Sequence, residues 1–248
     1  MNALVAKLKS NQFACELLTR CNFPSAGAPL NCAVSGGKDS MAMLLLACLN
    51  GCDVTAIHVD HSLRVGSDAE AQVVDQLAKL LGAKFISKTI KVEPGSNLEA
   101  RAREARYSVL PRDIATGHTA DDQAETVLIN LLRGAGLQGL AGMQRGHAHP
   151  ILGLRRSETE QLCAMFEIKC VVDPSNSDPK FLRNRVRHEL MPLIDQISQR
   201  DVAAILDRQA ELFRDDAELL DELAKAIDPT DAKAVATAPL ALARRAIR

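Results

Sequence analysis

Short apolar runs alternate with amphipathic helical patterns between residues 30 and 133, and this alternation constrains the fold more than any other feature of the chain. Each apolar run has the length of a buried strand, and a segment with helical spacing follows each one. The four runs are residues 30–34, 53–59, 84–90 and 113–116. Strands that alternate with helices in this way form βαβ units, with helices on both faces of a parallel sheet. We therefore predict an α/β fold with a doubly wound parallel sheet.

Helical patterns also flank the predicted sheet along the chain. Residues 4–18 carry apolar side chains at helical spacing, and helical patterns dominate again from residue 181. An apolar run at 150–154 is the expected last strand. We expect three parts: a lead-in helix at 1–21, the α/β domain at 22–172, and a smaller helical segment at 173–248.

The charge balance allows a local basic patch but excludes a polycationic coat. Lys and Arg total 30 against 31 for Asp and Glu, and the formal net charge is −1. No apolar run reaches the roughly 18–20 residues that a membrane span needs. The 7 cysteines include no CxxC pair, so they indicate buried small side chains in a reducing compartment rather than a metal site. We expect a cytoplasmic protein without membrane association.

A polar hexapeptide lies between the first predicted strand and the helix that follows it. Its residues are Ser35, Gly36, Gly37, Lys38, Asp39 and Ser40. Ligands of open parallel sheets bind beyond the carboxyl ends of the strands. Glycine lets the backbone approach a ligand closely there, and the start of a helix attracts anions. The loop therefore indicates a phosphate site, and the other interpretation is a tight turn without a ligand.

The charges in the loop refine this interpretation. Lys38 adds a positive charge, whereas the carboxylate of Asp39 tolerates phosphate only if Mg²⁺ lies between them. A Walker A loop needs glycine where Cys32 stands and serine or threonine where Asp39 stands, so that motif is excluded. The six-residue GxGxxG fingerprint of dinucleotide-binding proteins is also absent from this position.

Three acidic residues open the helix predicted at 121–133. Asp121, Asp122 and Glu125 fall within about one helical turn, and His118 precedes them at the end of the fourth strand. The helix dipole alone favours carboxylates at a helix start. Their place at the end of a strand favours a site, in which one acid helps to hold Mg²⁺ and another orients or deprotonates an amine.

Basic residues gather after the predicted sheet, with no acid among them. They are Lys180, Arg183, Arg185, Arg187 and His188. One interpretation is a solvated basic face. The other is a patch that binds nucleic-acid phosphates, which a chain of balanced charge needs if it is to hold RNA. Arg133, Arg155 and Arg156 are expected to extend the patch.

The hexapeptide matches the SGGxDS loop of the N-type ATP pyrophosphatases. Further stretches follow it in order, and together they resemble the tRNA(Ile)-lysidine synthetase family of the PP-loop superfamily. The stretches are IHVDHSLR at 57–64, REARY at 103–107, GHTADDQAET at 117–126, DPSN at 173–176 and FLRNRVRH at 181–188. The resemblance extends from about residue 30 to residue 193.

The resemblance implies an activity. Members of the family bind tRNA(Ile) that carries a CAU anticodon, and they adenylate the C2 oxygen of the wobble cytidine with ATP and Mg²⁺. The ε-amino group of L-lysine then displaces AMP and gives lysidine. The implied enzyme is a ligase that forms a carbon–nitrogen bond and releases AMP and diphosphate. A homodimer is also implied, and 248 residues are few for this family.

The resemblance also implies roles for residues, which we state as expectations. Catalytic roles fall to Asp39, Asp121, Asp122 and Arg106. ATP contacts fall to Ser35–Ser40, Asp60 and His118, with His61 beside Asp60. Metal ligands are expected at Asp39 and Asp121, and lysine contacts at Asp121 and Glu125. Contacts with tRNA fall to Lys180, Arg183, Arg185, Arg187 and Arg133. Thr119 departs from the family, which usually has a second histidine at that position.

Two other functions are compatible with a PP-loop. A tRNA thiolase usually carries a cysteine pair for a cluster or persulfide, and CxxC is absent here. A non-catalytic nucleotide-binding protein predicts loss of the acids after His118, yet Asp121, Asp122 and Glu125 are present. Both observations favour the lysidine synthetase.

Overall fold

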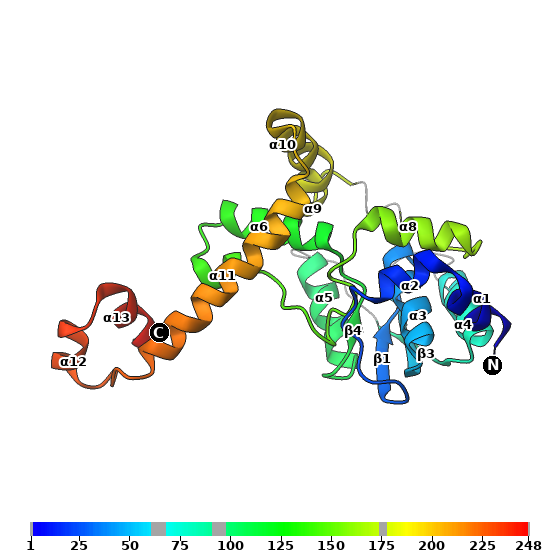
Figure 1. Ribbon diagram of the computed structural model, residues 1–248, viewed down its shortest axis with the longest axis horizontal. Helices are drawn as coiled ribbons and strands as arrows, with labels where there is room; N and C mark the ends of the chain where they lie inside the picture. Colours follow the sequence, from blue (N-terminus) through cyan, green and yellow to red (C-terminus); the bar gives the residue numbers. More distant parts are fainter. Residues whose placement is uncertain (1, 61–67, 91–97, 174–177, 248) are drawn as a thin grey trace. The chain divides into compact units, whose positions relative to one another are not determined.

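The computed structural model describes residues 2–60, 68–90, 98–173 and 178–247, with backbone only at 68–69, 98–100, 102–103 and 106. Within these ranges, four parallel strands form a sheet in the order β3-β2-β1-β4 (Figure 1). The strands are β1 (Pro29–Ala33), β2 (Asp53–Asp60), β3 (Lys84–Thr89) and β4 (Ala115–Thr116). Cys32 of β1 lies opposite Ala56 of β2 on one side and Ala115 of β4 on the other. The predicted parallel sheet is confirmed.

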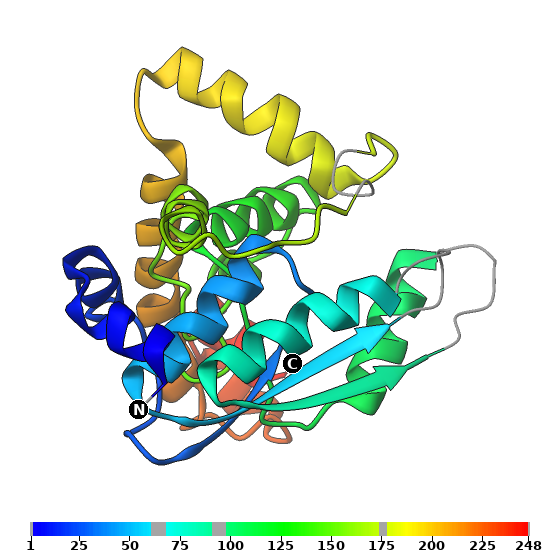
Figure 2. The same ribbon diagram turned by 90° about the vertical axis from the view of Figure 1, so that its right-hand side faces the viewer.

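The connections between strands place helices on both faces of the sheet. Helices α3 (Lys38–Asn50) and α4 (Asp68–Leu81) lead from β1 to β2 and from β2 to β3, in one direction across the sheet. Helix α5 (Leu98–Val109) returns past them to β4. Right-handed crossovers then put α5 on the face opposite α4, as Figure 2 shows. The direction of connection therefore reverses between β1 and β4, which makes the space beyond their carboxyl ends the switch point of the fold.

Helix α3 is the centre of the main hydrophobic core. Its residues 41–47 are all buried, because the sheet covers one side and other helices cover the rest. Those helices are α1 (Ala3–Ser10), α2 (Gln12–Leu18) and α8 (Arg156–Met165). The expected helix at 4–18 is two helices, because Asn11 leaves the helical conformation and its side chain accepts a hydrogen bond from Ala14 N at 2.9 Å.

The strand expected at 150–154 is not present, and that prediction is wrong. This segment forms turns, although Ile151, Leu152 and Leu154 are fully buried. Its backbone bonds to loops instead of a strand ladder: Ala120 N donates to Leu154 O at 2.8 Å, and Asn22 N donates to Pro150 O at 2.8 Å. An apolar run of this length satisfies burial in either conformation, so periodicity alone did not distinguish them.

The chain divides into two compact units whose boundary differs from the expected one after Val172. The first unit contains residues up to Asp121 together with Arg145–Asp178, and the second contains Asp122–Gln144 together with the residues from Pro179 onward. The inserted segment belongs to the second unit because Ala124 and Leu128 pack against Val186 and Ala203. Helix α6 (Ala120–Leu132) therefore begins in the first unit and continues in the second.

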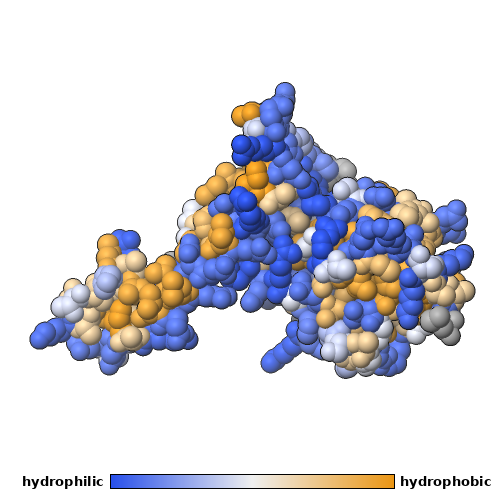
Figure 3. All heavy atoms as spheres, in the orientation of Figure 1, coloured by the Kyte–Doolittle hydropathy of each residue, from blue (hydrophilic) through white to orange (hydrophobic). Residues whose placement is uncertain are grey.

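The second unit is helical in the residues described, as expected for the C-terminal part. Its longest helix is α11 (Val202–Ala224), which Asp201 caps and which packs against α7 (Leu137–Leu140), α10 (Met191–Ser198) and α13 (Leu240–Ala246). The other elements are α9 (Leu182–Arg185), a π-helical turn at Val186–Leu190, and α12 (Ala232–Thr237). Figure 3 shows apolar surface over α12 and α13, and Leu219 and Leu240 are exposed in this region.

The cysteines do not form disulfides. All seven are free thiols, and Cys32 and Cys163 are buried. Burial raises the pKa of Cys21 and Cys48 to about 12, so these thiols stay protonated and serve as small apolar side chains. Among the described residues, no helix has the length and apolar character needed to cross a bilayer.

Candidate active site

The predicted phosphate loop lies at the switch point of the sheet, between the end of β1 and the start of α3. Gly36 has φ +88°, and a Cβ atom there would stand 2.7 Å from Val171 Cγ2. Gly36 O also accepts a hydrogen bond from Val171 N at 2.9 Å. Only glycine fits this backbone conformation and this close approach. The loop is therefore a tight turn, and Val171 in the segment after α8 holds it in place.

The loop after β4 packs directly against the start of α3. A Cβ atom on Gly117 would lie 2.9 Å from Ser40 Cα and 3.0 Å from Asp39 O. Glycine at this position lets the carboxyl ends of β1 and β4 approach each other. The two sequence motifs that begin at Ser35 and Gly117 are consequently adjacent in the first unit.

Hydrogen bonds within the loop fix the two serines. Ser40 Oγ donates to Gly37 O at 2.9 Å and lies 3.2 Å from Ser35 Oγ. Gly37 N donates to Ser35 Oγ at 3.4 Å. Helix α3 begins immediately after Gly37, so its first N–H groups and the positive end of its dipole face the loop. This is a suitable cradle for an anion.

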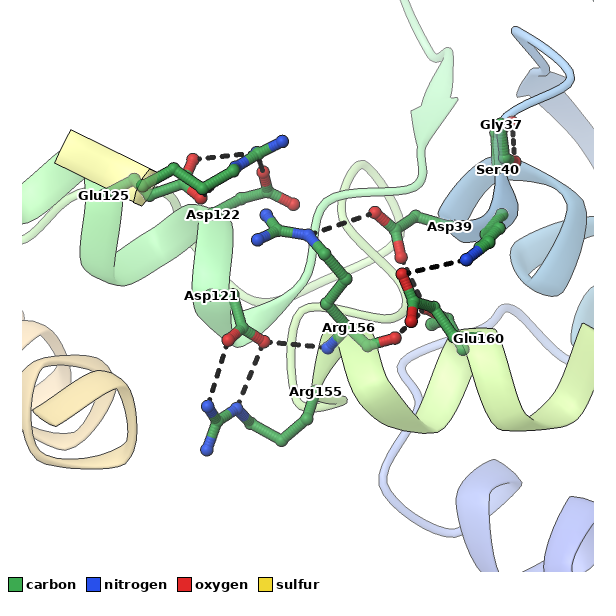
Figure 4. Close-up of polar contacts among 12 residues, drawn as sticks. Gly37, Asp39, Ser40, Asp121, Asp122, Glu125, Arg155, Arg156 and Glu160 are labelled. Carbon is green, nitrogen blue, oxygen red and sulfur yellow. Dashed lines mark hydrogen bonds and ion pairs between the residues drawn. The ribbon is translucent and has the colours of Figure 1, made fainter. Parts of the chain in front are cut away.

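Helix α8 holds both charged side chains of the loop (Figure 4). Glu160 Oε1 lies 3.2 Å from Lys38 Nζ, and Arg156 Nε lies 3.7 Å from Asp39 Oδ2. Thr159 Oγ1 donates to the other oxygen of Asp39. Neither Thr159 nor Glu160 carries a sequence signal, because each resembles an ordinary helical residue.

Asp121 accepts hydrogen bonds from two residues at the start of α8. Arg155 donates to both of its carboxylate oxygens, at 3.0 and 3.1 Å, and Arg156 N donates to Oδ2 at 2.8 Å. Burial opposes ionisation, but these hydrogen bonds and the two nearby arginines outweigh it and lower the pKa of Asp121 below its ordinary value. We call Lys38, Asp39, Asp121, Arg155, Arg156, Thr159 and Glu160 the loop cluster.

Arg155 and Arg156 thus contact acids of the first unit. Their sequence positions predict an extended basic patch with Arg133. Both side chains are instead engaged by Asp121 and Asp39, at the positions just described. Arg155 also caps the start of α8, since its N–H donates to Glu158 Oε2 at 2.7 Å.

His118 lies at the end of β4 with two polar partners. Thr116 Oγ1 is 2.8 Å from His118 Nδ1 and 2.8 Å from His149 Nδ1, and the two rings meet edge to face. Thr119 is fully buried, whereas His118 is only partly buried.

A second set of charges lies in the second unit. Arg183 Nε donates to Glu125 Oε2 at 2.8 Å and Arg183 Nη2 to Asp122 Oδ1 at 3.1 Å. Arg187 Nε donates to Glu125 Oε1 at 2.7 Å and Arg187 Nη2 to Asp122 Oδ1 at 3.2 Å. We call these four residues the arginine–acid cluster. Glu125 has only 2% of its side-chain surface exposed, so the cluster is a largely buried, charge-balanced network.

The other predicted residues are distributed as follows. Asp60 ends β2 and is half-buried, and its backbone O accepts from Ile90 N at 2.8 Å. Arg133 and Lys180 are exposed, and Arg185 forms an exposed pair with Glu189 at 3.1 Å. His61 and the side chain of Arg106 lie outside the described residues. The basic run at 180–188 is therefore not one patch: two of its arginines neutralise acids of α6, and the others face solvent.

Comparison with known proteins places this site in a class. A family model described as a PP-loop domain matches residues 10–194, which include the sheet, the phosphate loop and α8. A U34-tRNA thiolase from Methanococcus maripaludis has the same fold, with a TM-score of 0.63 and 17% identity over 85% of this chain and 80% of that one. The fold and the loop are thus those of a PP-loop protein.

Closer relatives identify the family within that class. A tRNA(Ile)-lysidine synthase of Rhodococcus erythropolis (strain PR4 / NBRC 100887) is 43% identical over 233 residues, which are 87% of this chain and 71% of that protein. Another of Nocardia farcinica (strain IFM 10152) is 39% identical, over 92% of this chain and 76% of that protein. This chain belongs to the tRNA(Ile)-lysidine synthase family, as its motifs predict.

Proposed function

We propose that this chain joins L-lysine to the wobble cytidine of a tRNA(Ile) with a CAU anticodon. In the first step, the C2 oxygen of cytidine attacks the α-phosphorus of ATP, and diphosphate leaves. In the second, the ε-amino group of lysine attacks C2, and AMP leaves with the former C2 oxygen. The observation that carries the proposal is a phosphate loop at the switch point of a PP-loop fold, bordered by Asp39 and Asp121, in a chain of this family.

The loop is suited to ATP because its anion donors are already in place. The N–H groups at the start of α3 would receive phosphate oxygens, and Lys38 would add a compact positive charge once it exchanges Glu160 for phosphate. The side chains of Lys38 and Glu160 are each about half exposed, so their ion pair is easily exchanged.

The carboxylates present fit Mg²⁺, which binds hard oxygen ligands and needs only one or two carboxylates besides phosphate. When bound, Mg²⁺ would stabilise the negative charge that develops on the leaving diphosphate. Asp39 fits this role better than Asp121, because its arginine contact is long at 3.7 Å, whereas three donors hold Asp121 at 3.1 Å or less.

Asp121 is better suited to orienting a cation than to accepting a proton. Its lowered pKa keeps it ionised at neutral pH and makes it a weak base. The arginine–acid cluster offers both kinds of charge that a free amino acid needs. Lysine carries one carboxylate and two ammonium groups, and Arg183, Arg187, Asp122 and Glu125 supply partners of either sign. We keep Asp121 and Glu125 as the proposed lysine contacts, as the family resemblance implies.

The remaining expectations concern tRNA, assembly and location. Arg133, Lys180 and Arg185 are exposed cations of the second unit and are proposed tRNA contacts, together with Arg183 and Arg187. Free lysine, ATP and tRNA occur together in the cytoplasm, where we place the reaction. Association of two copies is proposed from the family resemblance alone, and sedimentation of the purified chain tests it.

The function is tested by incorporation of labelled L-lysine into a CAU-anticodon tRNA(Ile) transcript with ATP and Mg²⁺. We expect one lysine per tRNA and no incorporation into tRNA(Met), which has the same anticodon. Incorporation of sulfur without lysine would mean a thiolase instead, which has the same PP-loop fold. Nucleotide binding without transfer of any group to tRNA would mean a non-catalytic protein.

A further inference from the structure

Thr159 has a hydroxyl group that contacts the phosphate loop as well as its own helix. Its side chain is fully buried on α8, yet it carries one hydrogen-bond donor. The two acceptors within reach are Asp39 Oδ1 and Arg156 O, the latter at 2.7 Å. Thr159 is 120 residues from Asp39 in sequence, so the contact is made by the tertiary fold and not by local helix structure.

The geometry points to Thr159 as a positioning residue: we propose that its hydroxyl sets the orientation in which Asp39 receives a divalent cation with ATP. This inference rests on the proposed use of ATP by the loop. Asp39 lies in the first turn of α3, where its carboxylate has several staggered orientations. Thr159 and Arg156, both on α8, approach different oxygens of that carboxylate and select one orientation.

The Thr159 contact is compatible with ligand exchange because Thr159 and Arg156 use different oxygens of Asp39. A hydroxyl group has a single hydrogen, and the ionised Asp39 is the stronger acceptor when no cation competes. A cation that replaced Arg156 beside Asp39 Oδ2 would leave the hydroxyl on Oδ1, and Arg156 O at 2.7 Å would remain a second acceptor. The buried donor is satisfied in both states, so cation binding does not pay the cost of leaving a buried hydroxyl without a partner.

The rest of α8 supports the same assignment. Glu160, the next residue, contacts Lys38, and Cys163 one turn later donates to Lys38 O at 3.4 Å. Arg156 N holds Asp121 at 2.8 Å. One face of α8 therefore contacts the two charged residues of the phosphate loop and the first acid of α6, and Thr159 lies at its buried centre.

The test compares Thr159→Val, which keeps the shape and removes the hydroxyl, with Thr159→Ser, which keeps the hydroxyl. Ser157→Ala is the matched control, because Ser157 is exposed on the same helix. The measurement is calorimetric binding of α,β-methylene ATP, which is not cleaved at the reacting bond, as Mg²⁺ is titrated. Binding of the same analogue without metal is measured in parallel.

We expect Thr159→Val to raise the Mg²⁺ concentration for half-maximal binding about tenfold, the usual size of an effect on a metal ligand from its neighbours. Thr159→Ser should stay within about twofold of the unsubstituted chain, Ser157→Ala should match it, and metal-free binding should be unchanged in all three. An unshifted Thr159→Val, an equal shift in Thr159→Ser, or an equal loss of metal-free binding would overturn the assignment.

Two further measurements address misfolding of the variant and the dependence of the effect on Asp39. If Thr159→Val does not unfold cooperatively, Thr159→Cys supplies a weaker donor of similar volume, and an intermediate shift is expected. In an Asp39→Asn background, Thr159→Val should cause no additional shift, since the hydroxyl acts through that carboxylate. The assay needs neither tRNA nor lysine. Failure of lysine transfer therefore leaves this result intact, whereas absence of nucleotide binding by the unsubstituted chain contradicts the ATP-using function itself.

Discussion

The loop cluster and the arginine–acid cluster use the same residue types in different ways. In the loop cluster, Lys38 and Glu160 are each about half exposed, and Arg156 Nε lies 3.7 Å from Asp39 Oδ2. In the arginine–acid cluster, two acids with 2% and 10% exposure meet two arginines at 2.7–3.2 Å. The half-exposed Lys38–Glu160 pair of the loop cluster can exchange its partners for a ligand. Removal of one charge from the arginine–acid cluster leaves the others buried without compensation.

The largest expected effect follows a change in the loop cluster, because Asp39 is the proposed metal ligand. Asp39→Asn should lower the rate of diphosphate release on the order of 10³-fold, because metal-assisted charge stabilisation is worth several kcal/mol. The free energy of unfolding should change little, since Asp39 is only partly buried. Single-turnover release of diphosphate measures the rate, and Asp75→Asn on α4 is the control. Near-normal release by Asp39→Asn would remove this residue from the site.

A change in the arginine–acid cluster should mainly lower the free energy of unfolding. Glu125→Gln should destabilise the chain by about 3 kcal/mol, because it leaves Arg183 and Arg187 facing a single acid. Glu189→Gln is the matched control: it breaks the exposed pair with Arg185 and should change the free energy of unfolding far less. Urea unfolding followed by helical circular dichroism measures both. Equal losses would mean that burial does not distinguish these pairs.

Exposed arginines and ion-paired arginines should differ in their contribution to tRNA binding. Neutralising exposed Arg133 and Arg185 should weaken binding and reduce the slope of log K against log salt by roughly 1–2, as two lost phosphate contacts do. Arg183→Gln with Arg187→Gln should reduce the slope less, since Asp122 and Glu125 already balance those charges. Filter binding at several salt concentrations measures the slopes. A larger change for the second pair would mean that those ion pairs open on tRNA.

The smallest expected effect is a pH dependence of stability. The folded-state pKa of Asp121 lies below its ordinary value of 3.8. The carboxylate therefore stabilises the folded chain above its unfolded-state pKa, and this contribution is lost as pH falls through the folded-state pKa. The difference in unfolding free energy between the unsubstituted chain and Asp121→Asn should be largest near about pH 6 and should decrease toward about pH 3. Arg155→Gln should flatten it, because that change removes the main side-chain donor.

The sequence predicts those features that depend on local pattern. The run at 30–34 is β1 within one residue, and the helix expected at 121–133 is α6 at Ala120–Leu132. The loop is recognisable because glycines, a strand and a helix start occur together in a few residues. The motifs at Ser35 and Gly117 meet because parallel strands end at one edge of the sheet, which the predicted topology already implies.

Contacts between distant segments are what the sequence does not predict. Arg183 and Glu125 are 58 residues apart, so the basic run at 180–188 suggests a solvent-exposed patch until the fold brings α6 against it. Arg155 meets Asp121 across 34 residues for the same reason. Thr159 carries no signal at all, since a threonine within a helix is usually a packing residue and its partner is remote.

The most direct test of the proposed reaction follows the label of ATP carrying ³²P in the α-phosphate. With CAU-anticodon tRNA(Ile) and no lysine, label should transfer to the tRNA as an adenylated wobble cytidine. Addition of L-lysine should then release the label as AMP and leave lysidine in its place. Release of labelled AMP without transfer to tRNA, or an adenylated tRNA that lysine does not discharge, would contradict the proposed two-step reaction.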